Sequence, residues 1–375
     1  MKRFIAIIPS LLLAVSAAAA AFNPGLVVVQ VGAGSGALAG TATAAFLQEF
    51  AFTGGLPVQT IALPTAVSGA NQILTLSGTS TSEGFLSLSA NGLYLTLGGY
   101  NQAVGNATST SLGNRTVGRI DMLGNVDTTT ILGDVASIGN IRSVVSDSGL
   151  GFWAGSSSGG MRYTTFGSTG PSTQLNSAAP TNLRVANIFA GLLYASAASG
   201  TFQGVATLGS GLPTTAGQTP SLLSGFPTAA GPSSYDYLFA SPSILYVADD
   251  RTTASGGGLQ KWTLSGSTWS LAYTLNSGLT AGLRGLTAVD DGVGNEVFYA
   301  TTADAITALA GNKLVSITDL LSATTLPGSE TFTTLATAAG NTAFRGVEVV
   351  PEPSTIALTG MGLLASAVFR RIRRN

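Results

Sequence analysis

The sequence contains no histidine and no cysteine, and only 9% of its 375 residues are charged, far below the roughly 25% of an ordinary soluble domain. These absences exclude imidazole acid–base catalysis, a Ser–His–Asp triad, His or Cys metal ligands, a catalytic thiol and disulfide bonds. Apolar residues nevertheless make up 45% of the chain, so it is not a disordered protein. With 49 glycines set among Val, Leu, Ile and Thr, the sequence predicts an all-β fold.

The first 21 residues have the pattern of a Sec-type signal peptide. Lys2 and Arg3 precede an apolar run at 4–15, and Ala19–Ala21 form an A-x-A cleavage site. The apolar run is too short for a comfortable membrane-spanning helix in the mature protein. We therefore expect export by the Sec machinery and a mature chain that begins near Phe22.

The last 25 residues combine a proline motif, an apolar segment and a basic end. Pro351, Glu352 and Pro353 separate the body from an apolar run at 356–369. As a helix this run would be about 21 Å long, shorter than the roughly 30 Å hydrocarbon core of a bilayer. Four arginines within the last six residues would stay in the cytoplasm. One interpretation is an ordinary C-terminal membrane anchor.

This three-part tail, residues 351–375, resembles the PEP-CTERM sorting signal of Gram-negative bacteria, which is also catalogued as an ice-binding protein C-terminal motif without implying ice binding. The resemblance implies that an exosortase, a membrane-embedded cysteine transpeptidase, recognises Pro351, Glu352 and Pro353 and removes the tail. It also implies transient insertion of the hydrophobic helix into the inner membrane, in a host that exports extracellular polysaccharide. The protein is then expected at the cell surface or in the extracellular matrix after tail removal.

Between these ends, the body at residues 22–350 retains 10 basic and 16 acidic side chains, a formal charge of about −6. That sign disfavours nucleic acids and anionic lipids as partners, because both require a basic surface. With nucleic acids and anionic lipids disfavoured, we expect the partner to be a polysaccharide or a surface protein. The sequence predicts no cofactor and leaves the metal content open.

The body consists of short apolar runs separated by Gly, Ser, Asn and Pro turns, without the periodicity of an amphipathic helix. A four-stranded unit recurs, and its first two strands form a hairpin that begins near residues 85, 143, 185, 237 and 286. Third and fourth strands are clearest at 259–264 and 269–275. These repeats predict five four-stranded blades.

The two ends of the body complement each other. Residues 346–350 look like a lone first strand, whereas residues 26–31, 46–52 and 58–63 look like second, third and fourth strands. Pairing them completes a sixth blade and closes a ring without disulfides. The sequence thus predicts a six-bladed β-propeller. A seven-bladed propeller, a β-helix and two β-sandwiches are the alternatives, although repeat spacings of 42 to 61 residues are too long and irregular for β-helix coils.

One charged residue precedes the apolar core of each predicted first strand. The six are Glu83, Arg142, Arg184, Asp236, Arg284 and Arg345. Because the first strand of a blade is innermost, these side chains are expected to surround one mouth of the central channel. One interpretation is a ring of salt bridges that locks neighbouring blades. Another is a binding site whose two excess arginines hold a carboxylate or an acidic sugar. Misalignment of the strands is the third.

Two pairs of acidic residues are further candidates. Asp249 and Asp250 precede Arg251 after a predicted second strand, and Asp290 and Asp291 lie in a turn between first and second strands. Paired carboxylates suit glycosidase chemistry or Ca²⁺ binding. In a propeller these two loops emerge on opposite faces, so the pairs are not expected to combine. Each pair is expected to cap its own turn instead.

The other candidates favour structural roles. Lys261 and Lys313, which could activate a serine, lie in or beside predicted outer strands, far from the channel. Trp153, Trp262 and Trp269 could stack on sugars, but their strand positions favour core packing. The glycine-rich segment after the first body strand lacks the register, lysine and helix of a phosphate-binding turn.

The leading functional hypothesis is an exported, exosortase-sorted protein whose non-catalytic propeller binds carbohydrate or protein. The alternatives are a propeller hydrolase or lyase that acts on extracellular polysaccharide, and a purely structural matrix component. An enzyme of that kind needs two carboxylates about 5 to 10 Å apart in a cleft, with a shifted pKa, whereas a binding protein needs only a suitable polar surface.

Overall fold

The computed structural model describes residues 20–108, 113–134 and 138–351. Within these ranges the chain forms 26 β-strands and one short 3₁₀ turn, Thr253–Ser255. The all-β prediction is confirmed. The predicted signal peptide up to residue 19, most of the proline motif and the predicted hydrophobic helix at 356–369 lie outside the described residues.

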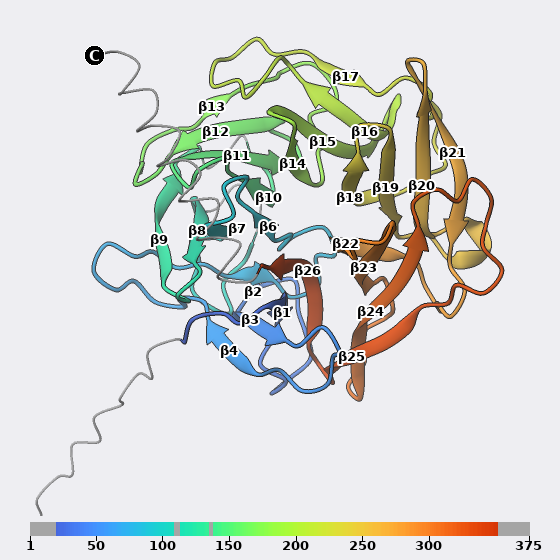
Figure 1. Ribbon diagram of the computed structural model, residues 1–375. Coiled ribbons are helices and arrows are strands. Elements are labelled where there is room, and N and C mark those ends of the chain that lie inside the picture. The colour runs from blue at the N-terminus through green and yellow to red at the C-terminus, as the bar shows by residue number, and fades with distance from the viewer. Residues whose placement is uncertain (1–19, 109–112, 135–137, 352–375) are drawn as a thin grey trace, which may run out of the picture.

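Six four-stranded antiparallel sheets surround a central axis, as Figure 1 shows, which confirms the six-bladed propeller arrangement. Blade 1 contains β26 (Ala343–Val350), β1 (Gly25–Val31), β3 (Ala45–Phe50) and β4 (Gln59–Ala62). Blade 2 contains β6 (Ser87–Leu88), β7 (Tyr94–Tyr100), β8 (Arg115–Asp121) and β9 (Val126–Leu132). Blade 3 contains β10 (Ile141–Val145), β11 (Gly151–Ser156), β12 (Met161–Thr165) and β13 (Thr173–Gln174).

The other three blades follow the same plan. Blade 4 contains β14 (Ala186–Phe189), β15 (Leu192–Ser199), β16 (Phe202–Leu208) and β17 (Pro220–Leu222). Blade 5 contains β18 (Ser234–Ser241), β19 (Ile244–Asp249), β20 (Gly258–Ser265) and β21 (Thr268–Leu275). Blade 6 contains β22 (Leu283–Asp290), β23 (Asn295–Thr302), β24 (Ala310–Leu320) and β25 (Thr333–Ala339). The first strand of each blade is innermost, and the fourth forms the outer rim (Figure 1).

The ring is closed by the first and last strands of the body, as the sequence predicts. β26 pairs antiparallel with β1, with Leu26 opposite Val349 and Val28 opposite Val347. Val28 and Val347 are fully buried, and burial of such a side chain contributes roughly 1.5–3 kcal/mol. Apolar burial across this seam, rather than a covalent link, therefore holds the two ends of the body together.

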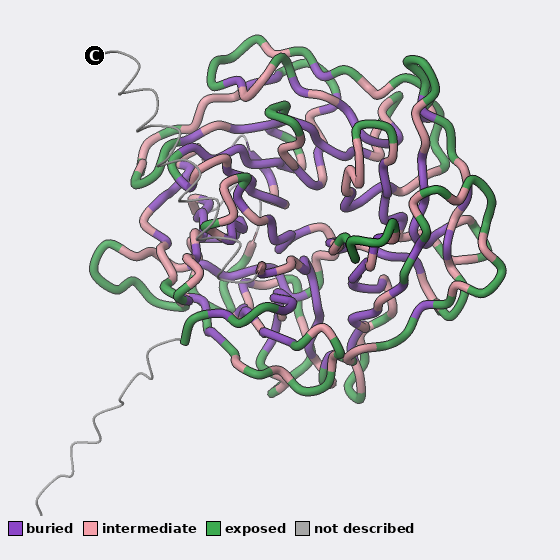
Figure 2. The backbone as a smooth tube through the Cα atoms, viewed as in Figure 1, coloured by how far each residue is buried: buried purple, intermediate pink, exposed green. Residues whose placement is uncertain are grey.

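The apolar core lies between neighbouring blades. One cluster joins Val29 and Leu47 of blade 1 to Leu95 and Leu97 of blade 2, and another joins blades 5 and 6. Figure 2 shows buried segments running through the blades and exposed segments in the loops. Each blade therefore buries its apolar faces only when its neighbours are present, which couples the stability of the six units.

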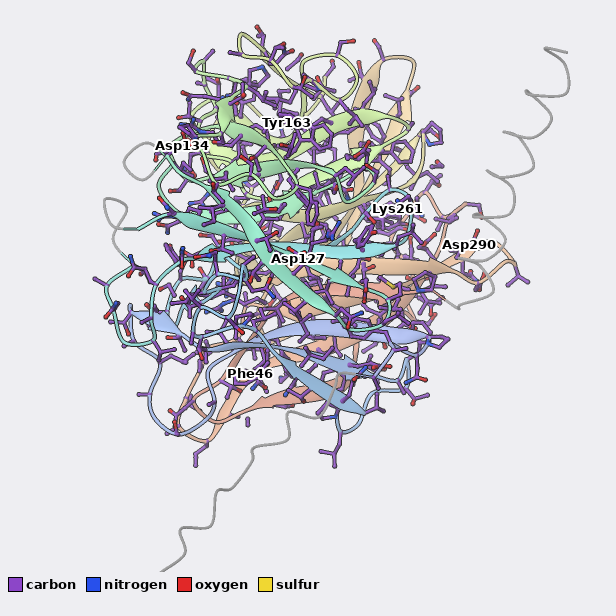
Figure 3. All side chains as sticks on the ribbon, turned by 90° about the vertical axis from the view of Figure 1, so that its left-hand side faces the viewer. Phe46, Asp127, Asp134, Tyr163, Lys261 and Asp290 are labelled. Carbon is purple, nitrogen blue, oxygen red and sulfur yellow. The ribbon has the colours of Figure 1, made fainter. Side chains whose placement is uncertain are left out.

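The disc has two faces. The face that we call the turn face carries the turns between first and second strands, such as the turn after Asp290, and the end of β26 at Val350. The opposite face, which we call the connection face, carries the connections from each blade to the next, including Asp134. Asp134 and Asp290 lie toward opposite edges of the molecule in Figure 3, where the disc is seen from its side.

Two features are absent from the sequence prediction. A two-stranded ribbon, β2 (Ala42–Thr43) with β5 (Leu76–Ser77), lies outside the blades. In addition, the rings of Phe85 and Tyr235, from blades 2 and 5 on opposite sides of the ring, lie with their centroids 5.7 Å apart. Both are buried, so aromatic side chains span the axis at this level.

Candidate functional site

The six charged residues predicted to share one end of the axis lie within or just before the innermost strands. Arg142, Arg284 and Arg345 belong to β10, β22 and β26, and Asp236 belongs to β18. Arg184 lies two residues before β14, and Glu83 precedes β6. Because these strands start at the connection face, the six residues lie toward that end of the axis.

The four arginines gather around one tyrosine and form what we call the arginine cluster: Arg142, Arg184, Arg284 and Arg345. The guanidinium carbons of Arg184 and Arg284 lie 3.9 Å and 5.8 Å from the ring centroid of Tyr235. Arg142 and Arg345 lie within electrostatic range of the Tyr235 side chain. Cation–π attraction to the ring thus offsets part of the repulsion between the two nearest guanidinium groups.

The arginines join neighbouring blades mainly through hydrogen bonds. Arg142 of blade 3 donates to the carbonyl of Leu183 (3.0 Å) and the Oδ1 of Asn182 (2.6 Å), just before the first strand of blade 4. Arg184 donates in the same way to the carbonyl of Ser234 (2.7 Å), in the first strand of blade 5. Arg142 and Arg184 therefore each reach forward to the next blade along the chain.

The predicted salt bridges within the ring do not form among the residues that the structure describes. The one ion pair that involves a ring member joins Arg284 to Asp250, which lies outside the ring, with Nε and Oδ2 3.1 Å apart. Arg345 donates instead to the carbonyl of Gly78 (3.1 Å). The expectation of paired charges was wrong because Arg142, Arg184 and Arg345 each donate to a main-chain carbonyl of an adjacent segment, and the two ring carboxylates have other partners.

Glu83 is fully buried and lies within electrostatic range of Arg142 and Arg345. It accepts hydrogen bonds from the Tyr100 hydroxyl (2.6 Å) and the Ser77 main-chain N–H (3.1 Å). Burial raises the pKa of Glu83, although these hydrogen bonds and the positive charge of Arg345 act in the opposite direction.

Asp236 does not join the arginine cluster. Its side chain accepts hydrogen bonds from the main-chain N–H groups of Tyr237 (2.9 Å) and Leu286 (3.1 Å), so that it connects blade 5 to blade 6. Burial raises the pKa of Asp236 well above its ordinary value, and the nearby carboxyl of Glu348 raises it further. The structure thus brings together five of the six predicted residues and assigns Asp236 a role between blades.

Glu348 is a half-buried inter-blade residue that the sequence analysis missed. Its Oε1 accepts a hydrogen bond from Thr287 Oγ1 in blade 6 (2.7 Å), and its Oε2 accepts one from the Leu88 N–H in blade 2 (3.1 Å). Burial raises the pKa of Glu348 to about 7. Its one signal in the sequence is a lone acidic residue between Val347 and Val349 in an apolar strand.

The positive charges of the arginine cluster exceed the negative charges around it. Asp250 pairs with Arg284, whereas Arg142, Arg184 and Arg345 have no carboxylate within ion-pair distance in the described parts of the chain. Burial and the charge of Arg284 lower the pKa of Arg345 to about 10, and burial and the charge of Arg184 lower that of Arg142. Each arginine therefore experiences its neighbour's positive charge.

Some donors of this cluster have no partner in the described protein. The Nε atoms of Arg142 and Arg345 are buried without a hydrogen bond. A buried donor without an acceptor costs roughly 1–3 kcal/mol, so an acceptor that entered here would recover free energy. Arg142, Arg184 and Arg284 are partly exposed, so solvent reaches these three side chains.

The four candidate aspartates all form hydrogen bonds or ion pairs with other residues of the propeller. Asp290 and Asp291 accept hydrogen bonds from the N–H groups of Gly292 and Val293, which confirms that this pair caps its own turn. Asp249 is buried and forms an ion pair with Arg251 (2.9 Å), and Asp250 pairs with Arg284. The two pairs lie on opposite faces, so they do not form one catalytic centre.

The two candidate lysines also have partners away from the axis. Lys261 and Asp319 are fully buried between blades 5 and 6, with Nζ and Oδ2 2.9 Å apart. The hydroxyl groups of Tyr246 and Tyr273 donate to the same carboxylate, and these four residues form what we call the buried ion cluster. Lys313 lies near Asp304, with Nζ and Oδ2 3.8 Å apart.

The three tryptophans are buried, which confirms the preference for core packing. Trp262 and Trp269 belong to the cluster that also contains Tyr237 and Val247. Trp153 is 3% exposed, and its Nε1–H donates to the carbonyl of Pro213 (2.7 Å). The described residues contain no group of three or more acidic side chains arranged to hold a metal ion. They also contain no helix with the length and apolar character needed to span a bilayer.

Comparison with known families identifies the C-terminal end. Residues 349–374 match the PEP-CTERM protein-sorting motif. The chain carries a PEP-CTERM sorting signal. This PEP-CTERM signal implies export, membrane-anchored sorting and processing by an exosortase. The match begins within β26, so the sorting signal adjoins the strand that closes the propeller.

Comparisons of the whole chain give distant structural likenesses. No curated protein sequence matches it. A putative 6-phosphogluconolactonase from Bacteroides uniformis is similar in structure at 13% identity and a TM-score of 0.46, over 84% of this chain and 83% of that one. The computationally designed Ika8 protein is similar at 12% identity and a TM-score of 0.36, over 86% of this chain and 89% of that one.

Proposed function

We propose that this PEP-CTERM protein is an extracellular, non-catalytic binding protein whose arginine cluster holds the carboxylate groups of an acidic polysaccharide. The observation that carries the proposal is the gathering of four guanidinium groups around Tyr235, where, among the described residues, only Asp250 forms an ion pair with one of them. Surplus positive charge in a partly desolvated position attracts an anion more strongly than the same charge on an open surface.

The chemistry of the cluster favours a planar oxyanion. A guanidinium group presents parallel N–H donors that match the two oxygens of a carboxylate. Arg142 and Arg184 each use one terminal nitrogen, Nη1, to hold the next blade. Their second terminal nitrogens have no hydrogen-bond partner among the described residues. A uronic acid of an extracellular polysaccharide would supply a suitable acceptor.

The path of the last strand fits binding at the connection face. Arg345 and Val350 lie on the same strand, β26, about 17 Å apart at roughly 3.3 Å per residue. The arginine cluster lies at the start of this strand, whereas the sorting signal continues from its end at the turn face. A tail held in the membrane would therefore leave the arginine cluster on the far side of the disc.

A glycan array tests this function directly. The full chain, purified in detergent, is applied to oligosaccharides of uronic acids and to their neutral counterparts. We expect binding to the uronic acid oligomers and a loss of affinity of about tenfold or more when Arg142 or Arg184 is replaced by alanine, because a charged hydrogen bond contributes roughly 1.5–3 kcal/mol. Arg119→Ala, which changes an arginine on a third strand, is the matched control.

The same array separates binding from a structural role. If alanine at Arg142, Arg184, Arg284 and Arg345 leaves binding unchanged in all four variants, the arginines serve only to join the blades. An unfolded variant is recognised by circular dichroism and is replaced by the corresponding lysine variant, which keeps the charge but removes the paired donors.

A further inference from the structure

A separate pocket opens between blades 3 and 4 near the turn face. Its volume is about 400 Å³, within the range of roughly 300–1,000 Å³ that ligand pockets occupy. Asp147, Trp153 and Tyr163 of blade 3 line one side, and Leu212 and Thr214 of blade 4 line the other. The arginine cluster lies at the other end of the axis, so the two sites are independent.

One wall of the pocket is aromatic. Tyr163 lies opposite Trp153 on adjacent strands, with ring centroids 5.3 Å apart and planes inclined by 46°. The Trp153 ring is buried and held in place by its hydrogen bond to Pro213, whereas Tyr163 is partly exposed. Trp153 therefore orients Tyr163, and Tyr163 presents an aromatic surface to the pocket.

Gly151 makes room for this aromatic wall. A Cβ atom at position 151 would lie 3.2 Å from both Cε2 and Oη of Tyr163, closer than an ordinary van der Waals contact. Because glycine lacks this atom, the tyrosine ring can lie against the strand. Alanine at this position would displace the ring without changing its chemistry.

The pocket also contains a half-buried carboxylate. Asp147 Oδ1 accepts a hydrogen bond from the Ser148 hydroxyl (2.9 Å), and Oδ2 has no partner among the described residues. The main-chain carbonyl of Asp147 accepts a hydrogen bond from the Asn91 N–H of blade 2 (3.0 Å), which fixes the position of the turn. Thr165 and Thr214 add hydroxyl groups to the lining.

We propose that this pocket binds one neutral hexopyranose unit of a polysaccharide. The apolar C–H face of a sugar ring packs on Tyr163, and two of its hydroxyl groups donate to Asp147. The negative charge of Asp147 disfavours a uronic acid in this pocket, so its ligand differs from that of the arginine cluster. With one site near each face, a single molecule can connect two polysaccharide chains.

The test uses the full chain on an array of neutral glucan, mannan and galactan oligosaccharides, followed by calorimetry with the best binder. Tyr163→Leu is expected to weaken binding about tenfold, because it removes the aromatic ring on which the sugar packs, and Tyr163→Phe is expected to retain it. Asp147→Asn is expected to weaken binding, as is Gly151→Ala. Asp290→Asn, in the equivalent turn of blade 6, is the matched control and is expected to bind like the wild type.

Two results would overturn the proposal. One is the absence of binding to every neutral oligosaccharide on the array. The other is binding that survives both Tyr163→Leu and Asp147→Asn in variants that fold normally by circular dichroism. Failure of the arginine-cluster proposal appears separately, as unchanged binding of uronic acid oligomers by the arginine variants.

Discussion

The buried ion cluster and the arginine cluster place charge in the same fold in opposite ways. Lys261 and Asp319 are fully buried between two blades, where they form an ion pair with each other. The Tyr273 hydroxyl also donates a hydrogen bond to Asp319. Arg142 and Arg184 are partly exposed at one end of the axis and lack a carboxylate partner in the described chain. Matched charge in the interior stabilises the fold, whereas surplus charge near the surface is available to a ligand.

The largest expected effect comes from breaking the buried ion cluster. Lys261→Met leaves the Asp319 carboxylate buried without its cation, and removal of one partner of such a pair costs about 3–5 kcal/mol. Urea unfolding measures the change in free energy. Arg142→Met is the comparison and is expected to cost less, because that side chain is partly exposed.

The double variant Lys261→Met/Asp319→Leu sharpens this test. Removing both charges takes away the unpaired carboxylate, so we expect it to be more stable than Lys261→Met alone. If Lys261→Met unfolds no more easily than Arg142→Met, the distinction between matched and surplus charge does not hold.

The next largest effect is a pH dependence of the free energy of unfolding, which originates at Glu348, near the axis. Its folded-state pKa of about 7 lies above the ordinary value of 4.5, so the folded protein holds this proton more tightly than the unfolded chain does. The resulting stabilisation is complete below about pH 4.5 and is lost as the pH rises through 7. Its size is about 2–3 kcal/mol, reduced from the full linkage value because water reaches part of the side chain.

Chemical unfolding across this pH range measures the contribution of Glu348. We expect the wild type to lose more stability between pH 5 and pH 8 than Glu348→Gln, which keeps the side chain's shape and removes its titration. Burial also raises the pKa of Asp236 and Glu83, so a smaller pH dependence remains in the variant. Identical pH profiles for the two proteins would contradict the assignment.

A smaller effect distinguishes arginines within the arginine cluster. Asp250 already offsets the charge of Arg284, whereas Arg184 has no such partner. We therefore expect Arg184→Gln to weaken the binding of a uronic acid oligomer more than Arg284→Gln does, by about fivefold, or roughly 1 kcal/mol. Calorimetry on the two variants measures the difference, and an equal loss would show that the Asp250 ion pair is irrelevant to binding.

The smallest expected effect concerns the turn at Asp290 and Asp291. Asp291→Ala removes the hydrogen bonds that its carboxylate accepts from the N–H groups of Val293 and Asn295 in an exposed turn, so we expect only a small loss of stability. Thermal unfolding detects this loss, while the binding of uronic acid oligomers on the opposite face remains unchanged. A change in binding would connect the two faces and contradict their independence.

The sequence predicts the architecture because the fold repeats a local pattern. Hairpins such as the one that turns at Asn91 and Gly92 have short-range signals, and the two terminal fragments complement each other in strand order. The ribbon of β2 and β5 was missed because each strand has two residues, too few for a recognisable alternation.

Contacts between blades are harder to predict because they depend on how separate sheets pack. Glu83 and Arg345 could be assigned to one end of the axis, since both occupy the same position in the repeat. The contact between Phe85 and Tyr235 crosses the whole ring, and no local pattern indicates it. Lys261 and Asp319 appear in the sequence as isolated charges in apolar strands, but their pairing requires the inter-blade packing.

Calorimetric titration with a galacturonic acid trimer tests the role of the arginine cluster most directly, with the neutral galactose trimer as its control. We predict that the wild-type chain binds the acidic trimer, more weakly as salt is added, and that Arg142→Gln/Arg184→Gln abolishes this binding while the protein stays folded. Equal affinity for the two trimers, or undiminished binding of the acidic trimer by the double variant, would contradict the assignment of an anion site to the arginine cluster.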